Sequence, residues 1–496
     1  MKRRKPKKPG RVSVKRVAIF LCFILVLLLV PYLWWVTSPK SDLSVIVYTK
    51  TVPDRKSQQH LGLAWFLKQY KYPNEEGVLF KPETTYYGYH PTADNPIQEL
   101  PELSNSTDLL YIADTYGIYH SNEGFSRIKN EEGIRNLIWG GASASDASLI
   151  RDFLNRERSS TVVAEYNTFA TPTPSYVQAQ LYETLGTRWT GWTGMYIHDL
   201  SPKGETPTWV LEQYEQSWDY NGSGIILYNI YDEVVVLRSG VELQKDEMLF
   251  SFTEAGTSIL GLSGSTKYEL LFDITEPMAS TEVLATYNLE VTEAGKELLQ
   301  SYGLSEQFAA IQLKETANHR SYYLGGNWAY SRQKLRFSNI AFMAPLMERF
   351  SSSDTQFFWK FYIPLLKSIF TEAEERSTVE IPPAKQDVYL DEDIALVARA
   401  TDRELLIFED GVWKPFFVHG VNLGTALPGR WFTEFPQDKS LYYRHLLQMG
   451  ELGINTLRIY TLLDPQFYDA FALYNRSHPD KPIYLMQEVW PEEEPP

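Results

Sequence analysis

The run DLLYIAD, Asp108–Asp114, places five consecutive hydrophobic residues between two aspartates. Continuous hydrophobic character over so short a stretch is typical of a strand in a parallel sheet that is covered on both faces. Comparable runs predict strands at Ser44–Tyr48 and Thr161–Tyr166, and helical patterns lie between the strands at Leu61–Tyr70 and Ser145–Arg156. Strands that alternate with helices in this way predict a doubly wound α/β domain.

Further strand and helix patterns continue this domain to residue 370. We expect a helix at Ser175–Leu185, strands at Gly224–Tyr231, Glu233–Leu237, Met248–Phe252, Tyr268–Ile274, Ile311–Lys314 and Tyr322–Leu324, and closing helices at Asn339–Phe350 and Gln356–Phe370. The following residues are acidic and contain two adjacent prolines, which is typical of a linker. The sequence therefore predicts an α/β domain over 42–370, a linker over 371–386 and a second unit over 387–496.

The composition of the 496 residues excludes several classes of protein. Hydrophobic residues make up 44% and aromatic residues 14%, which excludes a largely disordered chain. The single cysteine, Cys22, excludes an internal disulfide and a cysteine-rich metal site. The first 40 residues contain ten Lys and Arg and no Asp or Glu, so the rest of the chain carries 37 basic and 62 acidic side chains. Such an acidic body disfavours nucleic acid as a partner, and no motif predicts a metal ion or a cofactor.

The N-terminal segment predicts a membrane anchor. Nine Lys and Arg occur in residues 1–16, whereas residues 17–36 carry no charged side chain. Twenty residues form a helix about 30 Å long, which matches the hydrocarbon thickness of a bilayer. Since basic flanks stay on the cytoplasmic side, we expect a single-pass protein of the cell membrane with a cytoplasmic tail over 1–16, a transmembrane helix over 17–36 and an extracellular body. A cleaved signal peptide is the alternative, although the apolar run is longer than a typical signal core.

Polar and aromatic residues follow two of the predicted strands, where a doubly wound sheet usually binds its ligands. They are Asp114–Gly117 and Glu165–Thr168, and the aromatic segment Arg188–Tyr196 follows close by in the sequence. Aromatic rings beside hydroxyl, amide and carboxylate groups suit a sugar, because its ring faces stack while its hydroxyls form hydrogen bonds. The alternative is structural: the two tryptophans and Tyr196 of the aromatic segment pack in the core, and Glu165 is a capping carboxylate.

The predicted strand order over Ser44–Glu276 resembles the class-I glutamine amidotransferase-like fold, which also occurs as a non-catalytic domain beside some glycoside hydrolase barrels. The catalytic form of that fold needs a Cys nucleophile on a sharp strand–helix turn, with a His partner. Cys22 lies in the expected membrane segment, and GLSGS at Gly261–Ser265 does not have the spacing of a serine nucleophile motif. The sequence therefore predicts a binding or scaffolding role for this domain.

The second unit carries the most specific pattern in the chain. A strand pattern over Phe416–Gly424 ends in a polar turn, and two further strands are predicted at Asn455–Tyr460 and Ile483–Trp490. Helical patterns at Leu441–Leu452 and Gln466–Tyr474 separate the three strands. Strand and helix alternating at this spacing predict the opening of a (β/α)8 barrel.

Within this unit, GVN at Gly420–Asn422 and LGINTLRIY at Leu452–Tyr460 resemble glycoside hydrolases of clan A, especially the β-1,3-glucanosyltransferase type. In that clan the arginine that ends the second strand supports the catalytic nucleophile, and a guanidinium can orient a carboxylate through paired hydrogen bonds. The resemblance implies that Asn422 and Glu488 bind sugar hydroxyls and that aromatic side chains shape a glycan subsite. The implied substrate-binding residues are Asn422, Arg458, Tyr460, Glu488 and Trp490.

Retaining glycosidases need two carboxylates about 5–5.5 Å apart. In the clan these residues follow the fourth and seventh strands, and this chain reaches Pro496 shortly after the third predicted strand. We therefore expect an incomplete barrel that lacks both catalytic carboxylates. The expected function is a membrane-anchored, extracytoplasmic protein that resembles a glycoside hydrolase or transglycosylase of envelope polysaccharide metabolism, with a polysaccharide or oligosaccharide as its partner. The alternative is a non-enzymatic envelope protein that binds polysaccharide or acts as a scaffold.

Overall fold

The computed structural model describes residues 29–489, together with Lys15 and Val26. Within that range it leaves out residues 55, 104–105, 121–136, 155, 157, 215–217, 279–280, 317–318, 332–334, 378–388, 392–393, 410, 425, 432–435, 437–438 and 479.

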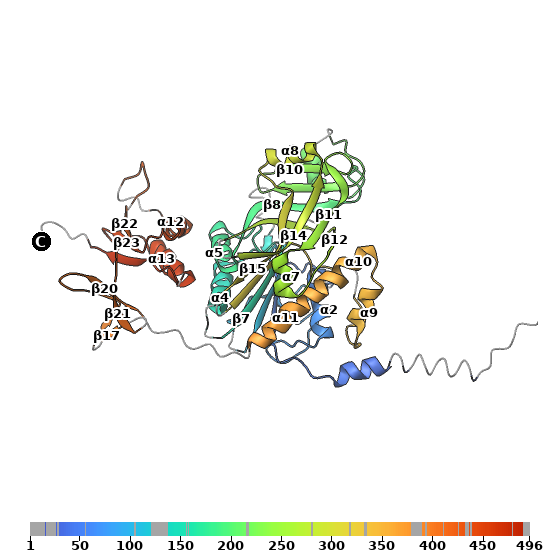
Figure 1. Cartoon of the computed structure of the whole chain (residues 1–496), viewed down its shortest axis with the longest axis horizontal. Coiled ribbons are helices and arrows are strands. Elements are labelled where there is room, and N and C mark those ends of the chain that lie inside the picture. The colour runs from blue at the N-terminus through green and yellow to red at the C-terminus, as the bar shows by residue number, and fades with distance from the viewer. Residues whose placement is uncertain are drawn as a thin grey trace, which may run out of the picture.

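A ten-stranded mixed sheet forms the centre of the N-terminal domain (Figure 1). Five neighbouring strands are mutually parallel, from β16 through β7, β4 and β1 to β2, and the strands beyond them on both sides are antiparallel to their neighbours. The order across the sheet is β12 (Ser265–Tyr268), β11 (Leu243–Phe252), β14 (Thr281–Val291), β15 (Gln307–Glu315), β16 (His319–Leu324), β7 (Ser160–Glu165), β4 (Leu109–Asp114), β1 (Val45–Thr49), β2 (Tyr87–Tyr89) and β3 (Ile97–Gln98). The doubly wound arrangement that the sequence predicted is thus limited to the parallel half of a mixed sheet.

Alternate residues of the central strands face two separate cores. Tyr111 of β4 packs with helices α2 (Leu61–Gln69) and α11 (Ile363–Ser377). The residues on either side of it, Leu110 and Ile112, pack with α4 (Ala144–Leu154) and α5 (Ser175–Leu185) on the opposite face. Because side chains alternate across a strand, every residue of β4 is buried, which explains its continuous hydrophobic run.

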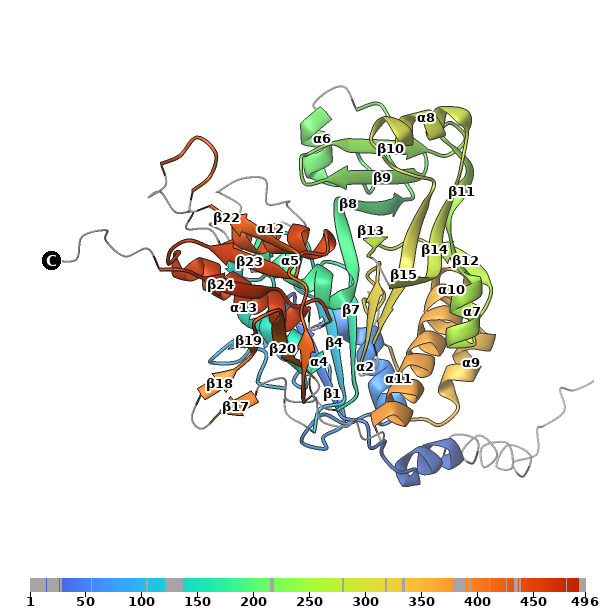
Figure 2. The ribbon, with the colours of Figure 1, turned by 60° about the vertical axis from the view of Figure 1, so that its left-hand side comes forward.

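A second, four-stranded antiparallel sheet lies at one end of the large sheet (Figure 2). Its order is β10 (Val234–Arg238), β9 (Gly224–Asn229), β8 (Thr187–Ile197) and β13 (Phe272–Pro277). Helix α6 (Thr208–Tyr214) contributes Trp209 and Val210 to the hydrophobic cluster against this sheet. The single strand predicted at Tyr268–Ile274 is therefore divided, because β12 belongs to the large sheet and β13 to the small one.

Short elements complete the N-terminal domain. They are η1 (Gln58–His60), β5 (Ile118–Tyr119), β6 (Leu137–Trp139), α7 (Glu254–Leu260), α8 (Glu293–Ser301), α9 (Met343–Arg349), α10 (Ser353–Phe357) and the π-helical turn η3 (Phe358–Tyr362), which leads directly into α11. Helix α11 extends to Ser377 and so includes the first residues of the predicted linker. Glu372 explains this extension, since it pairs with Arg320 at 2.7 Å and lies one helical turn from Arg376.

The C-terminal unit contains two small antiparallel sheets and one three-stranded parallel sheet. The antiparallel strands are β17 (Tyr389–Asp391), β18 (Ile394–Leu396), β19 (Ala398–Ala400), β20 (Leu405–Glu409) and β21 (Val412–Pro415). The parallel sheet follows as β22 (Gly420–Leu423), α12 (Lys439–Glu451), β23 (Thr456–Ile459), α13 (Pro465–Ser477) and β24 (Tyr484–Gln487). Both helices contact α5 of the N-terminal domain, and His478 Nε2 lies 3.0 Å from Glu183 Oε2 across this contact.

The predicted membrane anchor is corrected. Among the described residues, none of the helices combines the length and the apolar character that crossing a bilayer requires. Residues 29–37 are helical, whereas residues 17–25, 27 and 28 of the expected transmembrane helix and nearly all of the basic tail lie outside the described residues. The transmembrane helix over 17–36, the membrane as a partner and the single-pass location with an extracellular body are therefore not retained.

Candidate functional site

A pocket opens where the two sheets of the N-terminal domain meet. Its first wall comes from the segments that follow the parallel strands β4 and β7, and its second wall comes from β8, β9 and α6. Carboxyl ends of parallel strands are the usual place for a ligand site in an α/β sheet. The residues that line the pocket are Tyr116, Tyr166, Asn167, Ala170, Thr171, Trp189, Gly191, Thr193, Met195, Trp209, Tyr228 and Ile230.

Strand alternation along β8 divides the aromatic segment of the sequence between pocket and core. Trp189 and Thr193 face the pocket, whereas Trp192 and Tyr196 point to the opposite side and are buried in the main core. Gly191 has a φ of +88°, and a Cβ there would lie 3.3 Å from Ile230 Cγ1. A glycine is therefore suited to this position both by backbone conformation and by space.

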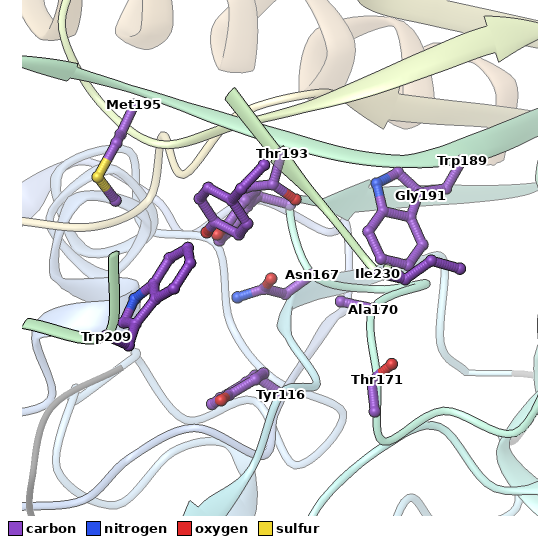
Figure 3. Close-up of a pocket in the computed structure, with 12 residues that line it drawn as sticks. Tyr116, Asn167, Ala170, Thr171, Trp189, Gly191, Thr193, Met195, Trp209 and Ile230 are labelled. Atoms are coloured by element: carbon purple, nitrogen blue, oxygen red, sulfur yellow. The ribbon is translucent and has the colours of Figure 1, made fainter. Parts of the chain in front are cut away.

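Asn167 lies in the middle of the pocket, between Trp209 on one side and Trp189 and Ile230 on the other (Figure 3). Its φ of 67° is left-handed, a conformation that Asn adopts more readily than most residues. Its backbone N–H donates to Asp273 Oδ2 at 3.1 Å, and its side-chain Nδ2 donates to Asp114 Oδ2 at 3.3 Å. Asp114 thus orients the side-chain amide of Asn167, and Asp273 holds the backbone of the same residue.

Both carboxyl groups are buried behind the pocket wall. Asp114 also accepts hydrogen bonds from Thr51 Oγ1 at 2.6 Å and from the backbone N–H of Tyr116 at 2.7 Å. Asp273 accepts from Thr193 Oγ1 at 3.2 Å and from the Tyr323 hydroxyl at 2.8 Å. Burial raises the pKa of each carboxyl to about 6, and the charge of Asp114 adds to the rise at Asp273.

The chemistry of the lining is aromatic and polar without charge. Five lining side chains are aromatic, at Tyr116, Tyr166, Trp189, Trp209 and Tyr228, and none of the described lining residues is charged. The cavity has a volume of about 100 Å³, counted as the space that the centres of water molecules can reach. A single water molecule needs roughly 10–15 Å³ of such space. The space therefore suits a ligand of about the size of one sugar ring. In the described part of the chain, no cluster of three or more His, Cys, Asp or Glu side chains could hold a metal ion.

The structure brings together part of each sequence segment that was expected to bind sugar. Tyr116 comes from the first segment, Asn167 from the second and Trp189 from the third. Glu165 belongs to the core instead, where it accepts hydrogen bonds from the backbone N–H groups of Trp328 and Ala329 at 3.1 and 3.0 Å. The hydroxyls of Tyr111 and Tyr362 donate to its other oxygen, and burial raises its pKa to about 8.

Five lining residues were absent from the sequence-based candidates, namely Ala170, Thr171, Trp209, Tyr228 and Ile230. The sequence predicted the strand that carries Tyr228, but not that the small sheet folds over the ends of β4 and β7. An aromatic residue without polar residues beside it in the sequence looks like an ordinary core residue, so the sequence alone does not indicate that it binds a ligand.

The predicted substrate-binding residues of the C-terminal unit lie on or beside the parallel sheet β22–β23–β24. Asn422 is the register partner of Arg458 on the neighbouring strand. Arg458 Nε donates to Glu488 Oε1 at 2.7 Å, and the guanidinium lies 4.6 Å from the centre of the Tyr460 ring. The side chains of Arg458 and Glu488 are 40% and 42% exposed. Four of the five residues are therefore close in the fold, and Trp490 lies outside the described residues.

Comparisons of this chain with family models, with curated proteins and with solved structures found no match.

Proposed function

We propose that this protein binds carbohydrate and that one sugar ring occupies the pocket between the two sheets. The observation that carries the proposal is the lining, in which five aromatic rings surround the amide of Asn167 and the hydroxyl of Thr193. Sugar ring faces stack on aromatic side chains while their hydroxyl groups exchange hydrogen bonds with amides and hydroxyls.

The same lining argues against an anionic ligand such as a nucleotide. Phosphate groups are usually bound by Arg, Lys or a helix N-terminus, and none of the described lining residues is basic. Burying an anion without a paired cation is costly. A neutral or positively charged ligand is therefore the better fit.

Asn167 supports the proposal because its amide is held in place before any ligand arrives. Its backbone N–H donates to Asp273 and one side-chain N–H donates to Asp114. Its side-chain oxygen can therefore accept from a sugar hydroxyl, and its second side-chain N–H can donate to one. Fixing a polar group in advance lowers the entropic cost of binding.

A second candidate function is contact with a β-linked glycan at the C-terminal unit, which resembles a glycoside hydrolase or transglycosylase but is expected to lack both catalytic carboxylates. The resemblance of this unit to clan A barrels supports it, together with the pairing of Asn422 with Arg458 in register. In a complete site of that type, Arg458 would orient the nucleophilic carboxylate, and Glu488 and Tyr460 would contact sugar. The two candidates are compatible, because they concern different regions of the chain.

The binding proposal is tested by titrating the full chain with β-1,3-linked and β-1,4-linked glucan oligosaccharides and following tryptophan fluorescence and heat of binding. The Trp189→Ala variant should bind at least about tenfold more weakly, because an aromatic anchor in a binding pocket contributes about 2 kcal/mol or more. Trp189→Phe should retain most of the affinity, since one stacking face remains.

Trp431→Ala is the matched control. Trp431 is 74% exposed and lies outside the pocket lining, so its removal should leave the affinity unchanged. Equal affinity of the Trp189→Ala variant and the unmodified protein, with both folded by circular dichroism, would contradict the proposal. Absence of binding by any oligosaccharide would contradict it as well.

A further inference from the structure

Two lining groups of the pocket contact buried carboxyls. Thr193 Oγ1 donates to Asp273 at 3.2 Å, and Asn167 Nδ2 donates to Asp114 at 3.3 Å. Each of these two lining groups is therefore in direct contact with a buried carboxyl. At neutral pH both carboxyls are largely ionised, since the pKa of each is about 6.

The nearest cationic side chains along the same strands are already paired with acids. Lys50, whose backbone N–H donates to the carbonyl of Asp114, has its ammonium 2.9 Å from Asp146 and is buried with it. Arg188, next to Trp189 on β8, lies 3.2 Å from Glu276 at the surface. Each of these two cations is therefore largely compensated by its own acidic partner, and neither of these ion pairs involves Asp114 or Asp273.

The aromatic lining adds to the negative potential of Asp114 and Asp273. The face of an aromatic ring is the negative end of its quadrupole and attracts a cation placed over it. Five such side chains line the pocket, and a charge in a poorly hydrated cavity is screened less than in bulk water. Rings and carboxyls therefore favour the same sign of charge on a ligand.

We propose that the sugar preferred by this pocket carries a protonated amino group, as a de-N-acetylated amino sugar does, and that the pocket rejects uronic acids. This inference rests on the proposed carbohydrate binding and names the class of sugar. Asp114 and Asp273 act in it as positioning residues, because they reach the ligand through Asn167 and Thr193.

The test uses three methyl glycosides of matched size at pH 7.0 on the full chain, with dissociation constants from tryptophan fluorescence. They are methyl 2-amino-2-deoxyglucoside, methyl glucoside and methyl glucuronide. The amino sugar should bind roughly three- to thirtyfold more tightly than the glucoside, which is the range expected for a cation over aromatic faces. The glucuronide should bind more weakly than both.

Equal binding of the amino sugar and the glucoside, or tighter binding of the glucuronide, would overturn the charge preference and leave carbohydrate binding intact. Failure of all three sugars and of the oligosaccharides to bind would overturn both proposals. The two failures are thus distinguishable on the unmodified protein, without reliance on a variant.

Two variants then locate the source of the preference. Asp114→Asn and Asp273→Asn should each reduce the ratio of amino-sugar affinity to glucoside affinity by about threefold or more. Glu276→Gln is the control, because this carboxylate is 59% exposed and paired with Arg188; the ratio should not change. An unchanged ratio in both Asp variants, with both folded, would overturn the assignment to these carboxyls.

Discussion

The pocket of the N-terminal domain and the polar face of the C-terminal sheet use similar side chains in opposite settings. In the pocket, Asp114 and Asp273 are buried and each accepts three or more hydrogen bonds around Asn167. On the C-terminal sheet, Glu488 contacts Arg458 with both side chains about two-fifths exposed. Aromatic and carboxylate groups occur in both regions, so their presence alone does not make a preorganised site. Burial is what distinguishes the pocket from the solvated pair on the C-terminal sheet.

The largest expected difference is in stability. Asp273→Ala leaves three buried donors, on Asn167, Thr193 and Tyr323, without their acceptor. At pH 5, where the carboxyl is largely protonated and its loss relieves little buried charge, we expect the free energy of unfolding to fall by about 3 kcal/mol or more. Chemical denaturation followed by circular dichroism measures this loss.

Glu488→Ala is the matched change in the exposed region. An exposed ion pair contributes little to stability because both partners are hydrated when they separate, so the same experiment should show no resolvable change. Comparable losses in the two variants would remove the distinction between the regions.

The next effect is the pH dependence of stability. Burial raises the pKa of Glu165 from 4.5 to about 8, and those of Asp114 and Asp273 from 3.8 to about 6. A carboxyl whose pKa is raised in the folded state contributes stability that is fully present below its unfolded pKa and is lost as the pH rises through its folded pKa. The protein should therefore lose stability between pH 4 and pH 8.

Glu165→Gln removes the largest of these titrations. Because an amide does not ionise, the stability of the variant should fall less between pH 5 and pH 8, by on the order of 2 kcal/mol. Urea denaturation at a series of pH values checks this. A variant that follows the same pH profile as the unmodified protein would show that Glu165 is not the buried acid responsible.

The smallest expected effect tests the independence of the two regions. Arg458→Ala should leave the affinity of the pocket for a methyl glycoside within about 1.5-fold, because single changes without shared contacts act additively. The same variant should weaken binding of a long polysaccharide if the C-terminal sheet also contacts glycan. A loss of monosaccharide affinity in this variant would mean that the pocket is not a separate site.

The sequence allowed four of the five strands in the parallel half of the large sheet to be predicted, all except β2. The run at Asp108–Asp114 corresponds to β4, and the helix predicted at Ser175–Leu185 has the same bounds as α5. These elements are continuous in hydrophobic character or strongly periodic, so local pattern alone identifies them.

The antiparallel strands of both sheets were harder to predict for a physical reason. Strand β8 alternates between the pocket and the core, and its TRWTGWTG sequence contains glycines and threonines that resemble a loop. The eleven-residue β14 is likewise interrupted by polar residues on its exposed side, and no strand was expected there. Pairing with neighbouring strands, rather than local hydrophobicity, determines such elements.

The candidate site was predictable only in part. Tyr116, Asn167 and Trp189 come from segments that chemistry alone had indicated, because polar and aromatic residues followed predicted strands. Trp209 and Tyr228 reach the pocket because the small sheet covers one end of the large one, and that arrangement depends on tertiary contacts far apart in the sequence. Glu165 was expected at the site and is not there. Its carboxyl group is buried at the end of β7, where it accepts hydrogen bonds from Tyr362 of η3 and from the backbone of Trp328.

The most direct test of carbohydrate binding at this pocket is an NMR titration of protein labelled with ¹⁵N-tryptophan, with indole signals assigned by single Trp→Phe variants. Addition of methyl 2-amino-2-deoxyglucoside or of a short glucan should shift the indole N–H signals of Trp189 and Trp209 and leave that of Trp431 in place. Shifts confined to Trp431 and other tryptophans outside the pocket, or no shift at saturating sugar, would contradict the account.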